Sequence, residues 1–173
     1  MVLKSPGARA LRFEGYGPEG AAVLLDCLTD DAEGLRARLR RTFREHGGHL
    51  GAEGSVSYLF DRVGCLRFDP RIDRGRLAQA AFEAGAEEVI GARERGPEVL
   101  TDPRDIESVR AALARAGWVA QQAEVTERAP LTVALSRGAV RRLTELLTAV
   151  AEVEGVRSVY SNVEISDAFL AHV

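Results

Sequence analysis

The sequence predicts an α+β protein of two small α/β domains, one of them ferredoxin-like and inserted into the other. The first observation is that residues 63–126 read strand-helix-strand twice, which is the element order of a βαββαβ domain. The second is that the flanking parts, 10–60 and 131–163, supply two more helices and about four strands. The third is that each of the four helical segments ends at a glycine and is followed by a strand-like segment; these glycines are Gly47, Gly85, Gly117 and Gly155.

This order defines the expected domain boundaries. We expect a flexible leader at 1–9, a discontinuous outer α/β domain at 10–61 and 130–173, and an inserted ferredoxin-like domain at 62–129. Pro130 lies in the second of the two short linkers that would connect the domains.

The first domain segment begins with two expected strands and one helix. Leu11–Glu14 is a short strand candidate, and Ala21–Leu28 is apolar enough to be a central strand covered on both faces. Asp26 is the exception in that strand: it is either a buried functional acid or a hydrogen-bonded or edge-facing residue. Thr29, Asp30 and Asp31 supply capping oxygens for a helix whose apolar stripe is Leu35, Leu39 and Phe43.

The remaining elements follow from the same patterns. Asp102 before Pro103 is expected to cap a helix, and Ser136 is expected to cap another. The other predicted elements are strands at 55–60, 63–68, 118–126 and 156–160, a helix at 76–84, and a hairpin of 87–92 with 98–101.

Composition limits the function classes. The formal net charge is −3 and the pI about 5.7, so the chain has no overall attraction for phosphates and would need a local basic patch to bind them. Cys27 and Cys65 lie in apolar strand-like segments and are expected to be buried free thiols in a reducing compartment. No signal peptide or stretch of 18 apolar residues is present, which predicts a cytoplasmic protein that does not enter a membrane.

Three motifs resemble a known family. They are FEGYGPEG at 13–20, GGHLGAEGSVSYLF at 47–60 and SNVEISD at 161–167, and together they resemble the YebC/PmpR family. Its members are regarded as probable transcriptional regulators, and its mitochondrial relatives as translational activators. The resemblance extends from about residue 12 to 167 and implies the inserted-domain arrangement.

The family pattern also includes a segment that this sequence is not expected to contain. Family members usually begin with a helical domain rich in lysine and arginine. The present chain starts near the point where that domain should end, so we expect the domain to be missing and direct nucleic-acid binding to be weakened.

The strongest candidate for a binding site is the arginine-rich segment Glu33–His46. Arg36, Arg40 and Arg44 stack at four-residue spacing opposite the apolar stripe, with Arg41 beside them. Guanidinium groups at this spacing can contact successive phosphates. The alternative is a solvated helix face in a protein that uses arginine in place of lysine.

The glycine-rich exit of this segment provides weaker candidates. His46 and His49 have a spacing that suits metal ligation, but no third ligand completes a site, and helix capping is the alternative. The backbone N–H groups of GGHLGAEG suggest a small anion nest, and Tyr16 either stacks on a base or packs over the end of a sheet. The predicted nucleic-acid-binding set is therefore Arg36, Arg40, Arg41, Arg44, His46, His49 and Tyr16, with no metal and no cofactor.

Catalysis has little support in the sequence. No G-x-S-x-G, H-E-x-x-H or cysteine–histidine arrangement occurs, so no catalytic residue is predicted and we do not expect an enzyme.

The leading hypothesis is a regulator of gene expression that binds DNA, RNA or the ribosome through a local basic surface or through a protein partner. The alternative is a small-molecule-sensing ferredoxin-like module without direct nucleic-acid binding.

Overall fold

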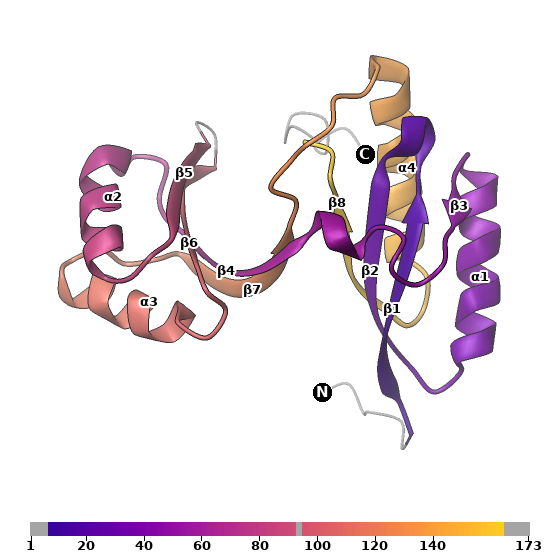
Figure 1. The fold of residues 1–173 in the computed structure, drawn as a ribbon, viewed down its shortest axis with the longest axis horizontal. Coiled ribbons are helices and arrows are strands. Elements are labelled where there is room, and N and C mark those ends of the chain that lie inside the picture. Colours follow the sequence, from indigo (N-terminus) through magenta and orange to yellow (C-terminus); the bar gives the residue numbers. More distant parts are fainter. Residues whose placement is uncertain (1–6, 93–94, 165–173) are drawn as a thin grey trace. The chain divides into compact units, whose positions relative to one another are not determined.

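The structure, a computed structural model, describes residues 7–92 and 95–164. The chain divides into two compact units (Figure 1). Unit 1 combines Met1–Phe60 with Ala129–Val173, and unit 2 is the continuous segment Asp61–Arg128. The predicted leader at 1–9 lies outside the described residues up to position 6, and Arg9 is already the first residue of a strand.

Unit 1 is built on a four-stranded antiparallel sheet of order β3-β1-β2-β8. Its strands are β1 (Arg9–Tyr16), β2 (Ala22–Thr29), β3 (His49–Leu50) and β8 (Val156–Ser161). Its helices are α1 (Ala32–Glu45) and α4 (Arg137–Ala151), with short 3-10 turns η1 (Pro18–Gly20) and η2 (Ser57–Leu59).

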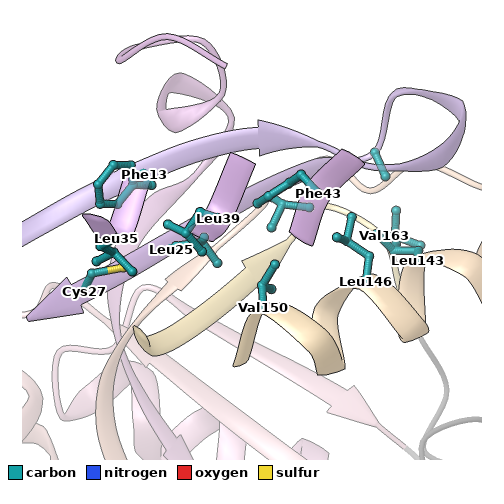
Figure 2. Close-up of a cluster of buried hydrophobic side chains, with 12 residues drawn as sticks. Phe13, Leu25, Cys27, Leu35, Leu39, Phe43, Leu143, Leu146, Val150 and Val163 are labelled. Atoms are coloured by element: carbon teal, nitrogen blue, oxygen red, sulfur yellow. The ribbon is translucent and has the colours of Figure 1, made fainter. Parts of the chain in front are cut away.

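The central strand of this sheet, β2, is covered on both faces. Val23, Leu25 and Cys27 point into a core that receives side chains from both α1 and α4 (Figure 2). Ala22 and Leu24 point to the opposite face, where they contact residues of the segment around η2. Burial on both faces explains why this strand is almost entirely apolar, as predicted.

Helix α1 begins and ends as its sequence predicts. The Asp31 carboxylate accepts the backbone N–H of Gly34 at 2.9 Å, which caps the first turn. Leu35, Leu39 and Phe43 are fully buried. Gly47, just past the helix, has a φ of +76°, a backbone conformation that side chains with a Cβ rarely adopt.

Unit 2 is a second four-stranded antiparallel sheet, of order β5-β6-β4-β7. Its elements are β4 (Asp61–Arg67), α2 (Arg74–Glu83), β5 (Glu88–Ala92), β6 (Gly96–Thr101), α3 (Ile106–Arg115) and β7 (Gln122–Arg128). Leu66 and Val99 of the sheet pack with Leu77 of α2 and Leu113 of α3, so both helices cover the same face.

The two halves of unit 2 repeat one local structure. An Asp-Pro-Arg sequence follows β4 and another follows β6, and in each the aspartate accepts the backbone N–H and the guanidinium of the arginine two residues later. The hydrogen bond from Arg71 lowers the pKa of Asp69, and the one from Arg104 lowers the pKa of Asp102 to about 2. The prediction that Asp102 caps α3 is therefore wrong: its carboxylate is used by Arg104, and Asp105 is the residue before the helix.

Two expected strands also differ from the structure. Residues 55–60 form the 3-10 turn η2 and its flanks, not a strand. Two of their backbone N–H groups bond to a side chain of unit 1 described below, and three bond to carbonyls three residues earlier. The last strand of unit 2 begins at Gln122. The Trp118 N–H donates to Leu113 O, which closes the end of α3, and its partly buried side chain packs against the core. Within residues 7–92 and 95–164, no helix combines the length and apolar character needed to cross a membrane.

Candidate nucleic-acid interface

The predicted arginine stripe lies on the solvent-exposed face of α1. Arg36, Arg40, Arg41 and Arg44 are all exposed, while the stripe opposite them is buried in the core of unit 1. The helix holds five arginines against two glutamates, Glu33 and Glu45. It is therefore a locally basic element in a chain of net negative charge.

The acidic neighbours of these arginines hold them only weakly. Arg36 lies 3.9 Å from Glu33 and Arg41 lies 4.0 Å from Glu45, both on exposed helix surface. The Arg36 guanidinium also lies over the Phe13 ring, 5.2 Å from its centroid. Arg40 and Arg44 have no acidic partner among the residues that the structure describes. Exposed ion pairs of this kind stabilise a protein by about 1 kcal/mol or less. Arg36 and Arg41 can therefore leave their glutamates and contact a phosphate at little cost in free energy.

The fifth arginine of α1 is held differently. Arg38 is partly buried, and its guanidinium lies 3.8 Å from Asp31 at the start of the helix. Its Nε is buried and has no hydrogen-bond partner in the described part of the chain. The arginines on this helix are thus not equivalent, and only the outward-facing ones are candidates for phosphate contact.

The histidines at the end of α1 have separate roles. His46 Nδ1 lies 2.9 Å from the carbonyl oxygen of Thr42, which can only accept, so this side chain donates a hydrogen bond within the last helical turn. His49 is exposed, and its ring stacks on Tyr16 with centroids 5.0 Å apart. The Tyr16 hydroxyl donates to Ser55 O at 2.9 Å, and the side chain is partly buried against the cluster that contains Val56 and Phe60.

The segment that follows these histidines is fixed by one buried carboxylate, that of Glu14 on β1. Glu14 Oε1 accepts the N–H of Gly54 at 2.8 Å, and Oε2 accepts those of Val56 at 2.6 Å and Ser57 at 2.7 Å. Burial raises the pKa of Glu14, but these three backbone hydrogen bonds outweigh it, and the net pKa lies below the usual glutamate value. Sequence reasoning missed this residue; the signal was an acid inside a strand next to a glycine-rich turn.

The glycines of this segment do not offer their backbone N–H groups to an external anion, as the suggested anion nest requires. Gly47 and Gly48 donate their backbone N–H groups to carbonyls of the last turn of α1. Gly51 donates to the Glu14 carbonyl, and Gly54 donates to the Glu14 carboxylate. The protein's own oxygens therefore use the donors that an external anion would need.

The three motifs of the family resemblance meet in unit 1. Glu14 joins the first motif to the second, and Glu19 joins the same first motif to α4. Glu19 Oε1 accepts the Ser136 hydroxyl at 2.6 Å, and Oε2 accepts the Ser136 backbone N–H at 3.1 Å. Asn162 of the third motif accepts the N–H of Ala22 at the start of β2, at 2.9 Å. The last residues of that third motif, from position 165, lie outside the described residues.

Other candidate groups are structural. Asp26 accepts a hydrogen bond from Arg12 Nε at 2.9 Å, which confirms the hydrogen-bonded alternative for that acid. Cys27 and Cys65 are buried free thiols, as predicted. Among the described residues, no group of three histidine, cysteine, aspartate or glutamate side chains is arranged to hold a metal ion.

Comparison with known proteins agrees with the fold and the motifs. The family model described as the TACO1/YebC second and third domain matches residues 8–163. A protein of Nitrosococcus oceani named "Probable transcriptional regulatory protein" is 37% identical over 171 residues, which are 99% of this chain and 69% of the relative. A protein of Methylococcus capsulatus with the same description is 40% identical over 163 residues, covering 94% of this chain and 66% of the relative.

A solved structure has the same fold. The crystal structure of a conserved hypothetical protein, Aq1575 from Aquifex aeolicus, superposes with a TM-score of 0.81 at 31% identity, covering 95% of this chain and 68% of that one. The present chain thus spans about two thirds of the length of the relatives it matches. The chain belongs to the TACO1/YebC family and corresponds to the family's second and third domains.

Proposed function

We propose that the chain is a regulator of gene expression that acts by binding, not by catalysis, and that the exposed arginines of α1 contact the phosphates of DNA or RNA. The observation that carries this proposal is the state of Arg40 and Arg44, which are exposed and have no acidic partner among the described residues. The names of the relatives, probable transcriptional regulatory proteins, support the regulatory part of the proposal.

The spacing of the stripe fits a phosphate backbone. Arg36 and Arg44 are eight residues apart, which is about 12 Å along a helix that rises about 1.5 Å per residue. Each phosphate that an arginine neutralises releases bound counterions, which strengthens binding at low salt. His49, held against Tyr16 at the helix exit, would extend the contact, whereas His46 and Tyr16 would act by positioning.

Two further parts of the proposal concern unit 2 and the partner. The strand-helix-strand repeat and the sheet order β5-β6-β4-β7 support a ferredoxin-like domain inserted into unit 1. The target would be DNA, RNA or the ribosome in the cytoplasm, reached directly or with a protein partner.

The proposal is tested by titrating the protein with a DNA duplex and with an RNA duplex over a series of salt concentrations. We expect the logarithm of the binding constant to fall linearly with the logarithm of the salt concentration. The variant R36A/R40A/R41A/R44A should bind less tightly and lose about 0.9 from the magnitude of the slope for each phosphate contact removed.

The matched control removes arginines from unit 2. The variant R71A/R104A/R110A also removes exposed guanidinium groups but leaves α1 intact, so its slope should equal that of the unmodified protein. If the protein binds neither the DNA duplex nor the RNA duplex at low salt, direct binding is refuted. If all three proteins have the same salt slope of the binding constant, the assignment to α1 is refuted.

A further inference from the structure

Helix α4 exposes a second set of arginines that the sequence analysis did not single out. Arg137, Arg141 and Arg142 are exposed, and the only acid on this helix is Glu145; the charge of Arg142 also acts on the exposed Glu19 carboxylate, which lies outside the helix. Arg141 lies 3.7 Å from Glu145 on exposed surface, a pair as weak as those on α1. The buried side of α4 is apolar and packs into the core of unit 1, so these arginines have no role in that core.

The two helices cover the same face of the sheet of unit 1. Leu39 and Phe43 of α1 enter one core cluster with Leu143 and Leu146 of α4 (Figure 2), and the helices contact each other. Helices packed in this way have axes about 8–10 Å apart. Their outward surfaces therefore form one layer, on which arginines from both helices are displayed.

The helices run in opposite directions in this layer. A Cβ on Gly48, just after α1, would approach both Phe43 and Leu146, and one on Gly155, after α4, would approach Leu35 near the start of α1. The end of α1 therefore lies beside the middle of α4, and the end of α4 lies near the start of α1. The first turns of α4, which carry its three arginines, therefore extend past the end of α1, so that these arginines continue the face beyond Arg44.

The side chains on this layer suit a phosphate backbone and not unstacked bases. The only aromatic residue in either helix is Phe43, which is fully buried. Proteins that bind single-stranded nucleic acid place aromatic rings against successive bases, and this surface has none to offer. A duplex needs no such rings, because its phosphates are displayed on the outside at about 3.4 Å axial spacing along each strand.

We infer that α1 and α4 together form one binding surface for the phosphate backbone of a double-stranded nucleic acid. We call it the two-helix arginine face; it consists of Arg36, Arg40, Arg41, Arg44, Arg137, Arg141 and Arg142. The inference rests on the proposed function and adds to it the contribution of α4 and the preference for duplexes. With guanidinium groups and no base-reading contacts, the face binds with little dependence on sequence.

The test compares R137A/R141A/R142A with the unmodified protein, the α1 variant R36A/R40A/R41A/R44A and the control R71A/R104A/R110A. Each is titrated over a salt series with a DNA duplex, an RNA duplex and a single-stranded oligonucleotide of equal length. We expect tighter binding to the duplexes than to the single strand. The α4 variant should lose about 0.9 from the salt slope for each contact removed, and the control should match the unmodified protein.

The outcomes separate this inference from the proposed function. If the α1 variant is impaired and the α4 variant binds like the unmodified protein, α4 is not part of the site, although the proposed function stands. Equal or tighter binding of the single strand overturns the duplex preference. If the unmodified protein binds none of the three probes, both the proposed function and this inference fail. Circular dichroism of each variant shows that a loss of binding does not come from unfolding.

Discussion

The Glu14 carboxylate accepts the backbone N–H of Val56 at 2.6 Å, although the two residues are 42 positions apart. Glu14 is only 4% exposed, and Val56 is fully buried in the cluster on the helix-free face of the unit 1 sheet. With the N–H groups of Gly54 and Ser57 on the same carboxylate, this contact fixes the segment that leaves α1. The exit of the proposed binding helix is therefore held by an internal charge.

The first prediction concerns removal of that charge. Glu14→Gln keeps the size of the side chain but replaces one accepting oxygen with an NH2 group that faces backbone donors. Hydrogen bonds to a charged group contribute about 1.5–3 kcal/mol each, so we expect a loss of about 2–4 kcal/mol in the free energy of unfolding. Urea denaturation followed by circular dichroism measures it. Glu33→Gln on the exposed surface of α1 is the control and should change stability by less than about 0.5 kcal/mol.

The same carboxylate predicts a dependence of stability on pH. The folded-state pKa of Glu14 lies below the usual value of 4.5, so its stabilising effect is complete above the unfolded pKa and is lost as the pH falls through the folded pKa. The stability difference between the unmodified protein and Glu14→Gln should therefore be constant near neutral pH and shrink on acidification below about pH 4.5. A difference that stays constant down to the acid unfolding of the protein would contradict this assignment.

The helices of both units could be predicted because their signals are local. A buried stripe such as Leu35, Leu39 and Phe43 recurs with the helical period, and a capping side chain such as Asp31 or Ser136 sits at a fixed offset from the N–H that it accepts. A strand that is covered on both faces can also be recognised in the sequence, because nearly all of its residues are apolar. These features need no knowledge of the rest of the chain.

The segment at 55–60 could not be predicted in the same way. Its alternation of polar and apolar residues is typical of a strand, but its backbone donors bond to Glu14, which lies on a different element. Asp102 is a similar case, since Arg104 two residues later uses the carboxylate that would otherwise cap the helix. The apolar stripe on α1 was enough to predict which of its arginines are exposed. The proximity of α4 to α1 could not be predicted, because it depends on how the whole of unit 1 folds.

The two cysteines should react slowly in the folded protein. Burial, followed by the nearby charge of Asp26, raises the pKa of Cys27 to about 11; burial and the charge of Glu98 do the same for Cys65. The thiolate is the reactive form, so at pH 8 only about 0.1% of each thiol is available. A disulfide reagent that releases a coloured thiol should therefore label both residues slowly in buffer and promptly in urea. Rapid labelling of either one in buffer would show that it is accessible in the native state.

A buried carboxylate in unit 2 should be important for stability. Glu98 is 6% exposed and accepts hydrogen bonds from Arg67 at 2.9 Å and from Arg128 at 2.9 Å. Glu98→Ala removes the carboxylate from two guanidinium groups, of which Arg67 keeps its hydrogen bond to Gln122. Removing one partner costs about 3–5 kcal/mol in a fully buried pair. Because about a third of each arginine side chain is exposed, we expect about 2 kcal/mol here.

The control for that variant is Glu107→Ala. Glu107 lies on the surface of α3 and is 3.6 Å from Arg110, with both side chains well exposed. Its removal should change the free energy of unfolding by about 0.5 kcal/mol or less. If thermal and urea unfolding gave the same loss in free energy of unfolding for both substitutions, the contacts of Glu98 with Arg67 and Arg128 would contribute no more than a surface ion pair.

The last prediction compares two costs of replacing a glycine in unit 2: an unfavourable φ angle alone, and the same with steric overlap. Gly96 and Gly117 have similar positive φ angles, +82° and +91°. A Cβ at Gly96 would overlap the carbonyl oxygen of Phe68, whereas one at Gly117 would have nothing within 4 Å. Gly117→Ala should therefore cost only the conformational term, about 1–2 kcal/mol. Gly96→Ala should cost at least about 2 kcal/mol more, because β6 must move away from the end of β4. If urea denaturation gave the same value for both variants, the close approach of Gly96 to Phe68 would not exist in solution.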